Sequence, residues 1–151
     1  MSAALSDASA DRPAHPDLLP RFLREAGVSK ASRIGVTGPS ALSALLWLCR
    51  HGYDHVGYIR SGEGAPHEEQ SDAILVAHTC GELELKRALS VARQVRPGGV
   101  FIFRLRTHPG SSLLGVEWLL KQHGFSVERR LEGVRRALVV ARRVAALQRA
   151  A

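Results

Sequence analysis

Short apolar runs alternate with longer amphipathic stretches along the chain from residue 33 onward. The short runs, which have the length of strands, lie at 33–36, 55–60, 73–77, 100–105, 125–130 and 134–141. Apolar residues recur at helical spacing in 17–26, 40–51, 82–96 and 112–121. Strands joined through a helix pair in parallel, whereas the brief connection at 131–133 makes the last two antiparallel. The pattern predicts a three-layer α/β sandwich whose mostly parallel sheet has about six strands and a C-terminal antiparallel hairpin.

The same repeats predict how the helices end and which side they bury. Glycines at 27, 52 and 124 are placed to end helices. Glu82 and Glu84 begin the helix at 82–96, and Arg93 and Arg96 close it, an order that complements the helix dipole. The residues predicted to face the core from the other two crossover helices are Leu42, Leu45, Leu46, Cys49, Leu113, Leu114, Trp118 and Leu120.

Composition predicts one domain, because 151 residues are enough for a single hydrophobic core. We expect a disordered lead at 1–15, an α/β domain at 16–143 and a basic tail at 144–151. No apolar run is long enough to span a bilayer, and the N-terminus does not resemble a signal peptide. We therefore predict a cytoplasmic protein with no membrane contact. Its two cysteines are expected to be reduced thiols.

The formal net charge of +7 raises the question of an acidic partner. Nucleic acid is one alternative, but aromatic residues make up only 5% of the chain, and the arginine-rich C-terminal segment has none to stack on bases. A protein partner or a second copy is another. Four acidic residues in a predicted loop at 61–72 either contact the arginines of a second copy or are simply solvated. They are Glu63, Glu68, Glu69 and Asp72.

Candidate chemistry begins at the turn Thr37-Gly38-Pro39-Ser40, where the first strand passes into a helix. Gly38 or Ser40 can cap the helix, and Pro39 suits its first turn. A helix N-terminus that faces the carboxyl end of a strand is a site for an anion or a nucleotide. The alternative is that this turn only connects two core elements.

Histidine and cysteine side chains follow successive strands at the same predicted edge. His78 is a candidate general base there. Cys80 is a weaker candidate nucleophile, because nothing nearby in the sequence favours its thiolate. His67, His78, Cys80 and His108 lack the spacing of known metal sites, so we predict no metal.

Three segments resemble class I S-adenosylmethionine-dependent methyltransferases. ARQVRPGGVFIFRL at 92–105 is similar to that family's helix, Pro-Gly-Gly turn and strand, and LLKQHGFSVERR at 119–130 to its late helix, Gly-Phe turn and penultimate strand. VRRALVVARR at 134–143 resembles its last strand. The likeness covers about 33–143 and implies a Rossmann-like fold with S-adenosylmethionine as cofactor. The cofactor residues that it implies are Thr37, Gly38, Ser40, Ser61, Glu63 and Thr79.

The chain departs from that family where the cofactor is held. The family's acid-x-Gly-x-Gly-x-Gly turn corresponds here to 36–42, where Val36 replaces the acid and only Gly38 of the three glycines is kept. Its acid for the ribose hydroxyls is replaced by Ile59, Arg60 and Ser61, which leaves Glu63 as the nearest substitute. A helix, a strand and a further helix that the family inserts before residue 73 have no room.

Two functions remain open on these grounds. The favoured prediction is a degenerate, non-catalytic binding or regulatory module with a methyltransferase fold. The alternative is an active S-adenosylmethionine-dependent methyltransferase with an atypical turn and His78 at the substrate. An active enzyme should have a cleft bordered by Gly38, Ser61 and His78, whereas a binding module should have it filled by side chains such as Leu42 or Ile59. A dehydrogenase is disfavoured because no Tyr-x-x-x-Lys pair exists.

Overall fold

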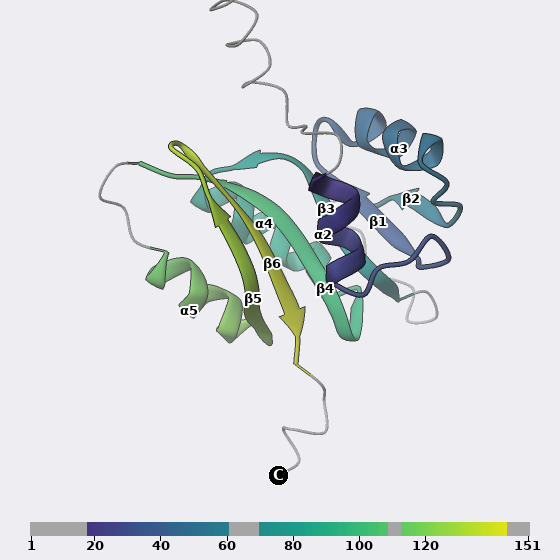
Figure 1. The fold of residues 1–151 in the computed structure, drawn as a ribbon. Helices are drawn as coiled ribbons and strands as arrows, with labels where there is room; N and C mark the ends of the chain where they lie inside the picture. Colours follow the sequence, from purple (N-terminus) through teal and green to yellow (C-terminus); the bar gives the residue numbers. More distant parts are fainter. Residues whose placement is uncertain (1–17, 61–69, 109–112, 145–151) are drawn as a thin grey trace, which may run out of the picture.

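A computed structural model describes residues 18–60, 70–108 and 113–144 of the protein. Over these residues six strands form one sheet in the order β2-β1-β3-β4-β6-β5 (Figure 1). The elements are α2 (Leu18–Glu25), β1 (Ile34–Thr37), α3 (Ala41–Arg50), β2 (Val56–Tyr58), β3 (Ser71–Cys80), α4 (Glu82–Ala92), β4 (Val95–Arg106), α5 (Leu114–Gln122), β5 (Phe125–Glu132) and β6 (Arg136–Arg143). β1 to β4 pair in parallel, and β6 pairs antiparallel with both β4 and β5. The predicted fold class is confirmed.

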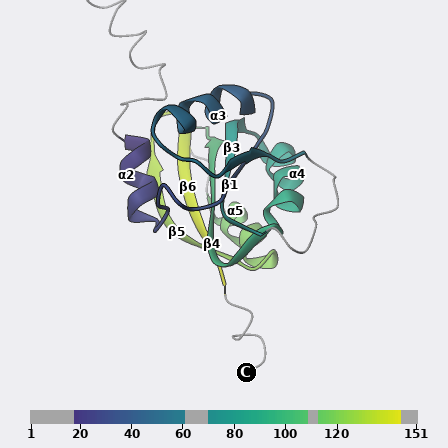
Figure 2. The same ribbon diagram turned by 90° about the vertical axis from the view of Figure 1, so that its right-hand side faces the viewer.

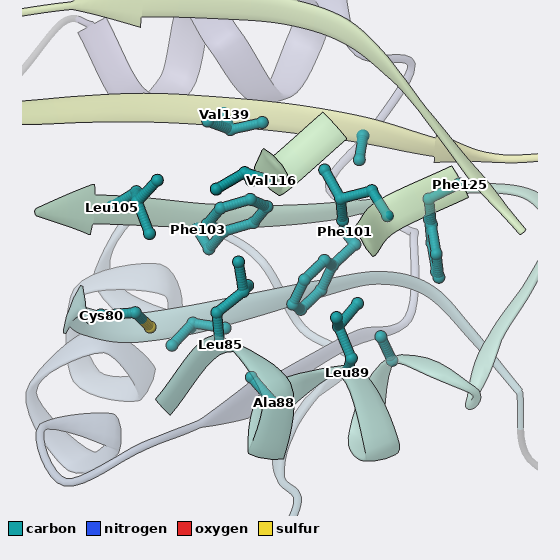
Figure 3. Packing of buried hydrophobic residues seen from close by; sticks show 14 of the residues in the cluster. Cys80, Leu85, Ala88, Leu89, Phe101, Phe103, Leu105, Val116, Phe125 and Val139 are labelled. Carbon is teal, nitrogen blue, oxygen red and sulfur yellow. The ribbon is translucent and has the colours of Figure 1, made fainter. Parts of the chain in front are cut away.

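Helices cover both faces of the sheet, so that the molecule has three layers. In Figure 2 the sheet lies between α2 on one side and α4 on the other. One core cluster joins α4 and α5 to the sheet through Phe101, Phe103 and Phe125, all of them buried (Figure 3). Burial of each such side chain contributes about 1.5 to 3 kcal/mol. A second cluster joins α2 and α3 to the opposite face.

The core face predicted for α3 is confirmed only at Leu45, which is partly buried against the core cluster. Leu42 and Leu46 are 70% and 49% exposed, and Cys49 is also exposed. Ala41 and Leu48 are buried instead. Two neighbouring rows of this helix are apolar, and the position at which α3 leaves β1 decides which row faces the sheet.

Helix α5 shows the same error on a smaller scale. Leu114 and Trp118 are 73% and 63% exposed, although both were predicted to face the core. Leu113 and Leu120 are buried, as predicted, and Val116 completes their row. The predicted set combined this row, at i, i+3 and i+7, with Leu114 and Trp118 at i and i+4, because both spacings fit the helical period.

The boundaries around β3 and β4 also differ from the prediction. Helix α4 ends at Ala92, four residues early, and the Pro97-Gly98-Gly99 turn lies within β4 as an irregularity of its pairing with β3. A Cβ on Gly99 would lie 2.6 Å from the Asp72 carbonyl oxygen, so only glycine fits there. Asp72 belongs to β3 rather than to a loop, and its carboxylate accepts the Arg33 N–H at 2.8 Å and contacts the Arg96 guanidinium.

Several predictions fall outside the described residues. These are the lead at 1–15, all of the tail at 144–151 except Val144, and the side chains of Ser61, Glu63, Glu68 and Glu69. Strand β2 lies at one edge of the sheet and is only three residues long. In the described part of the chain, no helix is long and apolar enough to cross a membrane.

Candidate functional site

The candidate site starts at the turn between β1 and α3. Thr37 ends β1 and is buried, and Gly38 then adopts a φ of +104°, which L-residues rarely tolerate. Ser40 occupies the N-cap position of α3, but its side chain makes no capping hydrogen bond. The predicted strand-turn-helix is therefore present, and the Ser40 hydroxyl is exposed rather than used as a cap.

His78 lies directly against this turn. A Cβ on Gly38 would lie 2.7 Å from the His78 Nδ1 atom, so the imidazole fills the space in front of the glycine. The cause is an irregularity in β3, where Leu75 pairs with Ile102 and Thr79 pairs with Arg104. Three residues of β3 thus face a single residue of β4, and such bulges re-aim side chains. The sequence predicted both residues at this edge, and the structure brings them together.

Glu84 holds the His78 ring in place. One carboxylate oxygen accepts the Gly81 backbone N–H at 2.8 Å, and the other lies 2.8 Å from His78 Nε2. The Gly81 N–H and then the His78 ring lower the pKa of Glu84, so the carboxylate is charged and Nε2 donates to it. In the neutral ring, Nδ1 then carries the lone pair. This atom is buried and has no hydrogen-bond partner among the described residues.

The remaining predicted cofactor residues are spread over the edge or lie outside the described part of the chain. Thr79 is half-buried beside Arg104 of β4, and Ser61 and Glu63 are not described. Of the two side chains expected to fill the cleft of a binding module, Leu42 is exposed. Ile59 instead packs against Gly35 of β1, which leaves no room for a Cβ at that position.

Cys80 has no nucleophilic character in this structure. Its side chain is fully buried, and burial, together with the nearby Glu84 carboxylate, raises the pKa of the thiol to about 11. A thiol of this kind is protonated at neutral pH and out of reach of a substrate. No group of three or more His, Cys, Asp or Glu side chains able to hold a metal ion occurs among the described residues.

Sequence reasoning missed two contributions to this edge. Glu84 was assigned only to the helix dipole, although its position three residues after Gly81 is the spacing of a capping box. Arg104 was read as part of an apolar strand. A charged residue inside such a strand was the available signal.

The fold is similar to those of solved S-adenosylmethionine-dependent methyltransferases. A structure of Burkholderia thailandensis 1,6-didemethyltoxoflavin-N1-methyltransferase with bound S-adenosylhomocysteine has a TM-score of 0.59 at 13% identity, over 94% of this chain and 83% of that chain. A methyltransferase from Aquifex aeolicus has a TM-score of 0.56 at 15% identity, over 83% of this chain and 89% of that chain. One from Mesorhizobium loti has a TM-score of 0.53 at 16% identity, over 82% and 96%.

These likenesses establish the fold alone, because all three identities lie well below 25%. No known protein family's sequence profile matches the chain, and no curated protein sequence matches it. The chain thus has a class I methyltransferase-like, Rossmann-like fold, as the resemblance in its sequence implied.

Proposed function

We propose that this protein is a non-catalytic binding or regulatory module that keeps the methyltransferase-like fold but does not hold S-adenosylmethionine in the manner of that fold's enzymes. The observation that carries the proposal is the imidazole of His78 against Gly38. The ring is fixed from behind by Glu84, which is itself bound to the Gly81 N–H. A ligand that approached Gly38 would have to displace this ring.

Displacing the ring would break its contact with the Glu84 carboxylate. That contact is a hydrogen bond to a charged carboxylate, so its loss weakens the binding of any ligand that displaces the ring. Val36, Ser40 and Leu42 stand where the enzymes have an acid and two glycines, so further contacts are lost at the same turn.

The alternative function, an active methyltransferase, is favoured by one observation. His78 Nδ1 is buried without a partner among the described residues, and its lone pair faces the turn. If the ring turned away from Gly38, this atom would be placed to accept a proton from a substrate. Thr37, Gly38 and Ser40 would then surround the cofactor, and Glu63 would bind the ribose.

Isothermal titration with S-adenosylmethionine and S-adenosylhomocysteine at moderate salt tests the proposal. We expect no binding of either compound by the wild-type protein up to about 1 mM, because contacts worth several kcal/mol are missing. His78→Ala opens the space in front of Gly38 and is expected to bind more tightly than wild type, if only weakly. His123→Ala, which removes an exposed histidine of the same size, is the matched control.

The active-enzyme alternative predicts the opposite pattern. Wild type would bind S-adenosylmethionine with a micromolar dissociation constant, Gly38→Val would abolish binding, and His78→Ala would not improve it. Any such result refutes the proposal and justifies a substrate search.

A further inference from the structure

Most arginines of the two C-terminal strands have partners within the chain. Arg142 binds Glu128 through two hydrogen bonds of 2.7 Å, and it also donates to the carbonyl oxygens of Ala26 and Gly98. The other pairs are Arg129 with Glu25, Arg130 with Glu117, and Arg143 with the carbonyl oxygens of Arg93 and Val95. These side chains therefore hold α2, α4, α5 and the sheet together rather than forming a free basic surface.

Arg104 and Arg136 differ from the rest. Arg104 pairs with Leu138 across the β4–β6 ladder, and Arg106 pairs with Arg136. Directly opposed residues share a face, so Arg104 and Arg136 are diagonal neighbours at the carboxyl edge, on the face that α2 and α3 cover. In the described part of the chain, neither has a hydrogen bond or an ion pair with an acid.

Arg106 belongs to the same row, directly opposite Arg136, but its side chain is exposed to solvent. The Gly81 N–H and His78 are the main causes of the lowered pKa of Glu84, and Arg106 adds to their effect from nearby. Arg104, by contrast, is half-buried, and burial followed by repulsion from Arg136 lowers its pKa. Two adjacent guanidiniums without a counter-charge destabilise the fold, and a violation of this kind is typical of a functional site.

We propose that Arg104 and Arg136 bind the phosphate monoester group of a small-molecule ligand, with the Thr79 hydroxyl as a further donor. A phosphate monoester carries a charge of about −1.5 to −2 at neutral pH, which balances two guanidiniums, whereas a carboxylate balances one. Arginine also binds phosphate through two parallel N–H donors. Thr79 pairs with Arg104 in the β3–β4 ladder and therefore lies beside it.

A small ligand fits this site better than a nucleic acid does. A nucleic-acid backbone needs a long track of free cations, but the other arginines of β5 and β6 already have partners within the chain. The inference goes beyond the proposed function, because the site does not use the turn at Gly38. It would hold whether or not S-adenosylmethionine binds there.

The test is a titration of the whole chain with inorganic phosphate at low salt. Binding is measured from the changes in the amide chemical shifts. We expect saturable binding that Arg104→Gln or Arg136→Gln weakens at least about tenfold, since each removes a charge-assisted contact. Arg130→Gln also removes one positive charge, but from an arginine that is paired with Glu117, and it is expected to leave binding unchanged. Acetate is expected to bind more weakly than phosphate.

Three outcomes would overturn the assignment. They are no saturation up to about 20 mM phosphate, equal weakening in Arg130→Gln, and acetate binding as tight as phosphate binding. If Arg104→Gln does not fold, Arg136→Gln decides the question, because Arg136 begins its strand and is partly exposed.

Relief of repulsion also predicts that ligand-free Arg136→Gln unfolds at a higher temperature than wild type, and a lower temperature would contradict the proposed repulsion. Titration with S-adenosylmethionine is a separate readout, so failure of either proposal is recognised independently.

Discussion

The two cysteines differ in exposure to solvent, although the sequence alone does not distinguish them. Cys80 is buried between β3 and α4, and burial and Glu84 raise the pKa of its thiol to about 11. Cys49 is exposed on α3. With an aromatic disulfide reagent near pH 8 we expect only Cys49 to react in the native protein, because thiolate and access are both needed. Cys49→Ser should remove the fast reaction, and both thiols should react after unfolding. Rapid labelling of native Cys49→Ser would show that Cys80 is accessible.

Asp72 illustrates how one side chain fixes the relation between elements. Its carboxylate accepts the Arg33 N–H just before β1 and contacts Arg96 at the start of β4, so it joins the beginnings of three strands. Asp72→Ala leaves both donors without this acceptor and is expected to lower the free energy of unfolding by about 1.5 to 3 kcal/mol in a urea titration. Asp54→Ala, at an exposed aspartate, is the control and should change it little. Equal effects of the two variants would contradict this role.

The elements themselves were largely predictable, because strands and helix ends depend on local sequence. Gly27, Gly52 and Gly124 have positive φ and end helices, as expected from sequence. The buried face of α3 was not predictable, since its two apolar rows satisfy the helical period equally well. The bulge in β3 was not predictable either, because it exists only relative to the register of β4.

At the scale of the whole molecule, the sequence predicted that Gly38 and His78 lie at one edge of the sheet, but not that they are in contact. Parallel topology alone brings the ends of β1 and β3 to one edge, so Gly38 and His78 were predicted to border the same site. Contact between the two depends on the bulge in β3. Within the described residues, Arg104 and Arg136 lack an acidic partner because the nearby acids pair with other side chains or lie elsewhere. Which arginine meets which acid depends on how the elements pack and cannot be deduced from the sequence.

The distribution of ion pairs also predicts how the whole molecule responds to acid. Hydrogen bonds from Arg142 lower the pKa of Glu128, and the Gly81 N–H followed by His78 lowers that of Glu84. Burial opposes ionisation of Asp72, but the Arg33 N–H and Arg96 outweigh it and lower its pKa as well. A carboxyl whose pKa is lower in the folded state stabilises the fold above its unfolded pKa, and this contribution is lost as the pH falls through the folded value. We therefore expect the melting temperature to fall steadily from about pH 5 to about pH 3.

Glu128→Gln tests that explanation, because it removes one of these carboxyls and leaves the others. The variant should melt at a lower temperature than wild type at neutral pH, and the difference should shrink as the pH falls, since the protonated wild-type carboxyl resembles the amide. Glu82→Gln, at an exposed residue of α4, should follow the wild-type curve. A difference between Glu128→Gln and wild type that stays constant across this range would mean that Glu128 acts through packing rather than through its charge. A melting temperature that rises on acidification would instead show that repulsion between carboxylates affects stability more than their attraction to arginine does.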